Sequence, residues 1–407
     1  RMSGGLSRDE VDENIEAGTQ HLRSLVGRAD GAQVTSNELA SGRHFANTLF
    51  NIMRGGIFPD EYKIRRDDLT DFVGKWNSTL QEEVSGLLAS LDDPLTRSTL
   101  LAAVEANGDA HMKRLVLEYL PLCFSRRHGD PSRPWNKFNI DIKADDGSEK
   151  LYYEGNWRDI FQIWEALAIS YPEFIVGFIT QFINASTVDG YNPYRLSRDG
   201  IDWEVPEPGN SWSNIGYWGD HQVNYLSRLL EFAQRYHPGR VSQLLNEDIF
   251  VYADVPYRLK GYSALLKNPR DSIEFDQERE RLVASRTRKM GADGKLVPLG
   301  DGSIYRVNLL EKLLVTLLSK LANFVPGGGI WMNTQRPEWN DANNALAGFG
   351  LSMVTLNYLR RLLKTTTSLI TDAASDSFMV SEEVVQFFGA VNQLLQKSVG
   401  ASIETID

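Results

Sequence analysis

The sequence predicts an all-α protein built as a barrel or toroid of helical hairpins, complete or incomplete, with only minor β-hairpins. Two observations support this prediction. Apolar residues recur three and four positions apart over most of the chain, which is the period of one helix face. The predicted helices are also joined by long polar loops rich in aromatic residues, and loops of this kind carry the chemistry of such folds.

Three helices are predicted near the N-terminus, at residues 9–26, 36–53 and 69–91, each with the apolar spacing of a helix. Ser36 followed by Glu38 is typical of a helix start, because a serine side chain can accept hydrogen bonds from the unpaired amides there. We take residues 1–135 as an N-terminal helical region and residues 136–407 as the barrel region.

One β-hairpin and three core helices are predicted in the rest of the chain. Residues 138–142 and 150–153 resemble strands, and the polar residues 144–148 between them are typical of a turn. The first core helix carries a leucine stripe interrupted by three charged residues. Its leucines are Leu309, Leu310, Leu313, Leu314, Leu317, Leu318 and Leu321, and its charged residues are Glu311, Lys312 and Lys320. The other two core helices are predicted at 346–370 and 384–399.

Composition excludes several classes of function. A formal net charge of -11 argues against nucleic-acid binding, which requires a basic surface. No apolar run is long enough to cross a membrane, and no export signal is visible, so we expect a cytoplasmic protein. The single cysteine, Cys123, lies in an apolar run and cannot form an internal disulfide. The six histidines show no metal-ligand spacing, and Gly327-Gly328-Gly329 lacks the features of a phosphate loop, so neither metal nor cofactor is expected.

The segment Arg336-Pro337-Glu338-Trp339-Asn340-Asp341-Ala342-Asn343-Asn344 combines two carboxylates, three carboxamides and a tryptophan. A tryptophan offers a flat face for a sugar ring, asparagines hydrogen-bond hydroxyls, and a carboxylic acid can protonate a leaving oxygen. These residue types favour carbohydrate chemistry. The alternative is structural: Asp341 and Asn343 would cap the next helix and Trp339 would pack in the core.

The same segment resembles the Trp-Asn-Asp motif of the inverting glycoside phosphorylases that include cellobiose and chitobiose phosphorylase. The resemblance implies that Asp341 is the general acid and that Trp339 lines the sugar site, with Glu338 and Asn340 binding substrate beside them. It also implies a toroid of the six-hairpin glycosidase type.

Three further segments follow the order of that family. Asn156-Trp157-Arg158-Asp159-Ile160-Phe161-Gln162 resembles its Tyr-Arg-Asp-x-x-Gln segment. That similarity implies that Arg158 and Asp159 hold the sugar on the non-reducing side of the cleaved bond, and it makes Gln162 a further candidate for substrate binding. Asn246-Glu247-Asp248 followed by Asp254-Val255-Pro256-Tyr257 resembles its Asp-Glu-x-Val-Pro-Phe segment.

The remaining segment, Tyr217-Trp218-Gly219-Asp220-His221-Gln222, stands where the family has Ser-Asp-Asp-x-Leu-Trp. It makes Trp218, Asp220 and His221 candidates for substrate binding, although His221 equally fits a helix start. It closes a long loop, 186–218, whose aromatic residues predict one wall of a sugar cleft rather than a packed surface loop.

The chain also departs from the family, within a resemblance that extends over residues 151–370. Ile163 stands where an Asp follows the Gln of the first segment, paired acids are lacking at Asp220, and Ala342 replaces a usual Gly. The change at Ile163 bears on sugar binding at that side of the site.

Inverting cleavage needs an acid for the leaving oxygen and a nucleophile on the opposite face of the sugar. We expect phosphorolysis of a di- or oligosaccharide, or formation of the same bond, with inorganic phosphate as co-substrate. An inverting hydrolase is the first alternative, with the base drawn from Glu165, Glu204, Asp220 and Glu338. The second is a non-catalytic helical module that binds glycan or acts as a scaffold in a larger protein. Further domains of a longer parent chain, or a homo-oligomer, are the expected protein partners.

Overall fold

The computed structural model describes the chain except residues 1–6, 30, 55, 108, 124–143, 146–149, 193–194, 204, 207–220, 270, 334–348 and 400–407. The described part is mostly helical with a few short strands, as the sequence predicts. Its α-helices are α1 (Arg8–Arg28), α2 (Glu38–Arg54), α3 (Arg66–Trp76), α4 (Gln81–Ala89), α5 (Arg97–Asn107), α6 (Ala110–Glu118), α7 (Trp157–Ser170), α8 (Ile175–Asn184), α9 (His221–Tyr236), α10 (Arg240–Gln243), α11 (Tyr262–Lys267), α12 (Gln277–Met290), α13 (Leu309–Leu321), α15 (Met353–Thr371) and α16 (Glu382–Ser398).

Short strands form four small antiparallel sheets, ordered β1-β2-β3, β10-β9-β8, β4-β7 and β5-β6. They connect helices and bury no continuous sheet face. The strands are β1 (Glu154–Asn156), β2 (Arg195–Ser197), β3 (Gly200–Asp202), β4 (Phe250–Val251), β5 (Tyr257–Leu259), β6 (Ile273–Phe275), β7 (Arg306–Val307), β8 (Phe324–Val325), β9 (Gly329–Trp331) and β10 (Leu351–Ser352).

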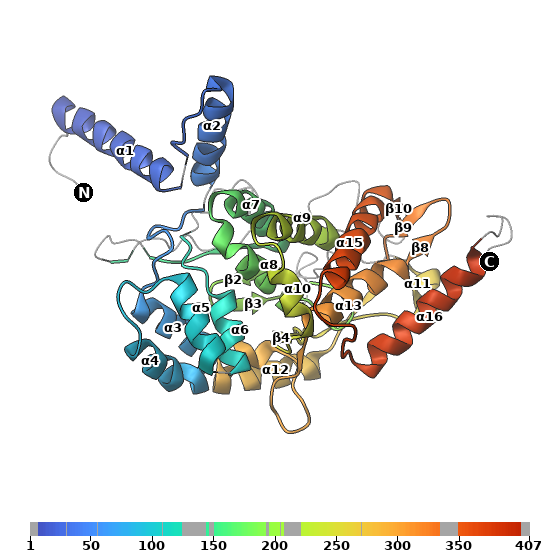
Figure 1. Cartoon of the computed structure of the whole chain (residues 1–407). Coiled ribbons are helices and arrows are strands. Elements are labelled where there is room, and N and C mark those ends of the chain that lie inside the picture. Colours follow the sequence, from blue (N-terminus) through green and yellow to red (C-terminus); the bar gives the residue numbers. More distant parts are fainter. Residues whose placement is uncertain are drawn as a thin grey trace.

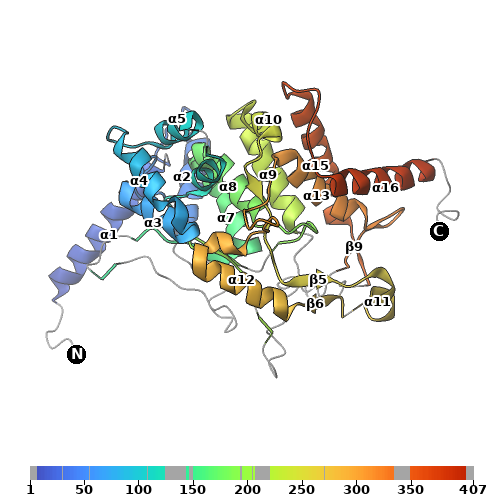
Figure 2. The ribbon, with the colours of Figure 1, turned by 90° about the horizontal axis from the view of Figure 1, so that it is seen from below.

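The helices lie in three groups along the molecule (Figure 1). The cluster α3–α6 lies at one end, α7–α10 with α13 and α15 lie in the middle, and α16 with β8–β10 lies at the other end. Helices α1 and α2 stand to one side, where α2 contacts α7. The view in Figure 2 keeps the same order and shows α11 beside β5 and β6.

The main hydrophobic core occupies the middle group. Helix α8 is buried along its whole length, and α7 contributes large rings that pack face to edge or face to face. Trp164, for example, stacks on Phe178 with ring centroids 5.2 Å apart. Helix α13 is buried almost all round, so its charged residues Glu311, Lys312 and Lys320 are buried too. A helix surrounded in this way is central to its core.

A second hydrophobic core lies within α3–α6 and takes nearly all its residues from positions 64–119. One residue from elsewhere, Ala292, completes it. A buried polar cluster joins this unit to the middle group: Arg114 donates to Glu118 at 2.9 Å and to Asp293 at 2.6 Å. Glu118 in turn accepts from Asn184 of α8.

Several predicted helices are confirmed. The structure has α1 and α2 at the first two predicted positions, and α13 and α16 at two of the three C-terminal ones. The start of α2 differs slightly, because Asn37 rather than Ser36 accepts a hydrogen bond from Ala40 N, at 3.0 Å. A local apolar period therefore locates these helices well.

The prediction of one helix over 69–91 is wrong. Helix α3 ends at Trp76 and α4 begins at Gln81, because Asn77 takes an extended conformation between them. Its side chain accepts from Thr79 N at 3.2 Å and donates to Asp293 at 2.9 Å. The partner that stabilises the break is far away in sequence, so the helical period does not show it.

The predicted hairpin of 138–142 with 150–153 is not found. Residues 150–153 are not in a strand, and 138–142 lie outside the described residues. Strand β1 follows at 154–156 and pairs with β2, so that Glu154 faces Ser197. Strands β2 and β3 form a hairpin within the predicted loop 186–218.

The helix predicted at 346–370 begins later, at Met353 of α15. Leu351 and Ser352 instead form β10, which pairs with Trp331 and Ile330 of β9. Ser352 also caps α15 by accepting from Thr355 N at 3.1 Å. Among the helices of the described part, none is long and apolar enough to span a bilayer.

Candidate functional site

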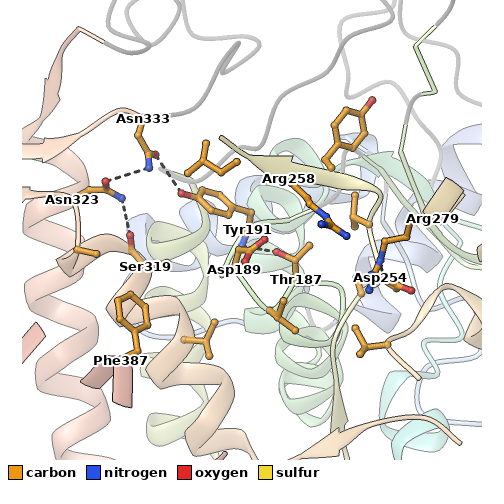
Figure 3. Close-up of a pocket in the computed structure, with 18 residues that line it drawn as sticks. Thr187, Asp189, Tyr191, Asp254, Arg258, Arg279, Ser319, Asn323, Asn333 and Phe387 are labelled. Atoms are coloured by element: carbon orange, nitrogen blue, oxygen red, sulfur yellow. Dashed lines mark hydrogen bonds and ion pairs between the residues drawn. The ribbon is translucent and has the colours of Figure 1, made fainter. Parts of the chain in front are cut away.

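A pocket of about 720 Å³ lies between the middle group of helices and the small sheets (Figure 3). Its volume falls in the range of about 300–1,000 Å³ that is usual for small-molecule sites. It is lined by the turn after α8, residues 253–259, α12, Val297, the end of α13 with the residues after it, and Asn333 two residues after β9. Helix α16 adds Phe387 at one edge.

The first wall is a tight turn, residues 187–191, from the loop that we predicted to line a cleft. Thr187 N donates to Tyr191 O at 2.7 Å, and Gly190 N donates to Thr187 O at 3.0 Å. Gly190 has φ +79°, and a Cβ there would lie 2.6 Å from Ser319 Oγ of α13. Only glycine permits both this conformation and this approach, so the turn presents Asp189 from a fixed backbone.

A chain of side-chain hydrogen bonds crosses the pocket wall between α13 and β9. Asn323 donates to Ser319 O at 2.9 Å and accepts from Asn333 at 3.2 Å. Asn333 accepts from Tyr191 Oη at 3.3 Å. Burial raises the pKa of Tyr191 to about 12, so its hydroxyl keeps the proton that it donates. These contacts position Asn333, the residue directly before 334–348.

The opposite wall carries charged groups. Asp254 is buried and forms ion pairs with Arg279 and Arg286 of α12. Two cations satisfy this carboxylate, so its role is to hold α12 against the 253–259 segment. Arg258 is more exposed and pairs with Asp276 at 3.3 Å.

Asp189 is the carboxylate that the pocket leaves accessible (Figure 3). Desolvation by the surrounding protein raises its pKa, while Arg258 and Arg279 act in the opposite direction. Lys312 lies beneath the same turn, with Nζ donating to Ser186 O at 3.3 Å and standing 3.4 Å from the Tyr252 ring centroid. Burial holds the pKa of Lys312 well below its usual range.

Most of the site residues predicted from the sequence lie outside the described residues: Trp218, Asp220, Glu338, Trp339, Asn340 and Asp341. Arg158 and Asp159 belong to the first turn of α7, and His221 begins α9, but their side chains are also outside the description. Gln162 is exposed on α7 and does not line the pocket.

The structure brings two of the predicted segments together at the pocket. Asp254 and Tyr257 come from the segment that resembles Asp-Glu-x-Val-Pro-Phe, and Tyr191 comes from the aromatic loop. Among the candidate bases, Glu165 is in an ion pair with Arg228 of α9 at 2.6 Å, and Glu204 lies outside the described residues.

The pocket residues that the sequence did not single out include Asp189, Arg258 and Phe387. A signal existed for Asp189, since Asp-Gly is typical of a tight turn and the turn falls inside the aromatic loop. Phe387 gave none, because its place in the apolar stripe of α16 is typical of an ordinary core residue.

Comparison with known families gives one match, at residues 58–121, to Glycoside hydrolase family 149 insertion domain 1. The matched segment contains every buried residue of the second hydrophobic core except Ala292. The match supports a carbohydrate-active protein of glycoside hydrolase or phosphorylase type, and it does not specify the cellobiose phosphorylase family. No curated protein sequence matches the chain.

Proposed function

We propose that this protein is an enzyme that cleaves or forms a glycosidic bond with inversion, by phosphorolysis of a di- or oligosaccharide. Its helices would belong to a toroid of the six-hairpin glycosidase type, which further domains or a second copy could complete. The match at residues 58–121 supports the carbohydrate-active class. Cys123 is the single cysteine and is buried, which suits a reducing cytoplasmic location.

One observation carries the proposal: the two ends of the acid-bearing segment are held together next to the pocket. Met332 N donates to Gly350 O at 3.0 Å, and β9 pairs with β10 immediately beyond. Asn333, which follows Met332, lines the pocket. The connection that includes Trp339 and Asp341 therefore begins directly after a residue of the pocket lining, and the residues on either side of it are hydrogen-bonded to each other.

Asp341 donates its proton to the glycosidic oxygen as the bond from that oxygen to the anomeric carbon breaks. An oxygen of inorganic phosphate attacks the anomeric carbon from the opposite face, so the product is a sugar 1-phosphate of inverted configuration. Trp339 would stack on the sugar, with Glu338 and Asn340 binding its hydroxyls.

The other substrate-binding residues proposed from the resemblance come from two further segments. Arg158 and Asp159 would hold the sugar on the non-reducing side, with Gln162 as a further contact, from the first turns of α7. His221 at the start of α9, with Trp218 and Asp220 before it, would contact substrate from the next segment.

The test is a screen of disaccharides and of sugar 1-phosphates with sugar acceptors, each with and without inorganic phosphate. Phosphate-dependent cleavage, with a sugar 1-phosphate of inverted configuration detected by NMR, is the expected result. Cleavage that proceeds equally without phosphate would establish an inverting hydrolase instead. If no glycoside or sugar phosphate turns over, the enzymatic proposal is wrong and a glycan-binding or scaffold module becomes the better account.

A further inference from the structure

The formal charges of the residues that line the pocket sum to zero. They are two carboxylates and two guanidinium groups, from Asp189, Asp254, Arg258 and Arg279. Two negative and two positive charges give a formal sum of zero, so the pocket offers no net attraction to an anion or a cation. The other polar groups of the lining are hydroxyls and amides, which suit a neutral ligand with many hydroxyl groups.

Phe387 supplies an aromatic surface at the edge of this polar pocket. Its side chain remains 38% exposed and lies beside Ser319 in Figure 3. An exposed ring next to hydroxyl-binding groups matches a sugar, whose C–H face packs on the ring while its hydroxyls meet polar side chains.

The adjacent residue, Phe388, provides a comparison within the same helix. Val384 and Val391 are the buried residues of α16, and residues three and four positions after Val384 flank that buried stripe on opposite sides. Phe388 is 49% exposed, similar to Phe387, but does not line the pocket. The two rings therefore differ mainly in which side of the stripe they occupy.

Asp189 supplies a fixed hydrogen-bond acceptor from the turn 187–191 of the pocket lining. Its turn is closed by hydrogen bonds between Thr187 and Tyr191 and by the contact of Gly190 with α13. A carboxylate held on such a turn can accept from two neighbouring sugar hydroxyls without first being ordered.

We propose that the pocket is a subsite for one neutral sugar unit of the substrate, with Phe387 as its stacking platform and Asp189 as the acceptor for its hydroxyls. The subsite rests on the proposed function, since it places a further unit of the same oligosaccharide at Asn333, directly before the segment that contains Asp341. It also specifies the substrate class as neutral rather than uronic or phosphorylated at this unit.

The experiment is calorimetric titration of the whole chain with a panel of glucose trisaccharides that covers each linkage, and with trigalacturonate as the anionic probe. At least one neutral trisaccharide should bind and trigalacturonate should not. Phe387→Ala should weaken that binding about tenfold, which corresponds to the upper range for an aromatic contact. Phe388→Ala should stay within about twofold of the unchanged protein, and Asp189→Asn should also weaken binding about tenfold.

Thermal unfolding of each variant shows whether the fold survives. Equal affinities of the two phenylalanine variants, or preferential binding of trigalacturonate, would overturn the subsite. If turnover depends on Asp341 while both Phe387→Ala and Asp189→Asn leave affinity and KM unchanged, the subsite alone is wrong. If those variants weaken binding but no substrate turns over, the subsite stands as a glycan-binding site and the proposed reaction is wrong.

Discussion

Asp341 is the residue on which the proposed chemistry depends most directly. Asparagine at this position keeps the size and much of the hydrogen bonding of aspartic acid but has no acidic proton to give. Asp341→Asn should therefore lower turnover by roughly a hundred-fold or more while sugar binding persists. Steady-state rates and calorimetric affinities measured on the same preparation would check this, and an unimpaired variant would remove Asp341 from the mechanism.

Gly190 shows how a single backbone position shapes the pocket. Gly190→Ala should destabilise the fold both through its positive φ, at about 1–2 kcal/mol, and through the clash with α13, at about 1–3 kcal/mol more. Gly239 is the matched control, since its φ is +84° but a Cβ there would meet nothing within 4 Å.

Urea unfolding of the two alanine variants separates these effects. Gly239→Ala should lower the free energy of unfolding only by the cost of the positive φ, about 1–2 kcal/mol. Equal losses at both glycines would show that the approach of the turn to α13 contributes nothing.

At the scale of elements, the hydrogen-bond chain from α13 through Asn323 positions Asn333, after which the connection with the proposed acid begins. Asn323→Ala removes the bond to Ser319 O and the one from Asn333. Because small displacements of catalytic groups cost up to about a hundred-fold in rate, we expect turnover to fall about tenfold or more. Two lost hydrogen bonds should reduce stability by only about 1–3 kcal/mol.

Asn357→Ala of α15 is the control for this variant. Asn357 donates to Met353 O at 3.0 Å, four residues earlier, as Asn323 does to Ser319. It is exposed and does not line the pocket. Comparable rate losses in both variants would mean that Asn323 has no positioning role.

At the scale of the whole molecule, the buried cluster between the two cores makes stability depend on pH. Burial raises the pKa of Glu118 to about 7, opposed by Arg114 and assisted by Asp293, because one buried cation faces two carboxylates. The folded state therefore holds a proton that the unfolded chain releases above its pKa of 4.5.

The stabilisation that comes from the proton on Glu118 is fully present below pH 4.5, the pKa in the unfolded chain. It is lost as pH rises through about 7, the pKa in the folded protein. The loss is about 3 kcal/mol on the scale of one pKa unit per 1.36 kcal/mol. Glu118→Gln should flatten the pH dependence of unfolding over this interval, measured by urea denaturation from pH 5 to pH 8. Glu83→Gln, on the exposed side of α4, should leave it unchanged. A Glu118 variant with the original pH profile would contradict the assignment.

Much of the fold was predictable because helical periodicity is local. Helices α1, α2, α13 and α16 follow from apolar spacing within about twenty residues. The sequence also indicated the segment around Asp341 and the aromatic loop, because unusual combinations of residue types are visible without any structure.

Contacts between distant residues needed the tertiary structure. The break at Asn77 is stabilised by Asp293, β1 pairs with β2 rather than with a neighbouring run, and Asp189 and Phe387 meet at a pocket from opposite halves of the chain. A local sequence pattern reflects only the conformational preferences of the residues within it. A hydrogen-bond partner about two hundred positions away, such as Asp293 for Asn77, is brought near only when the whole chain packs. The same packing forms the pocket.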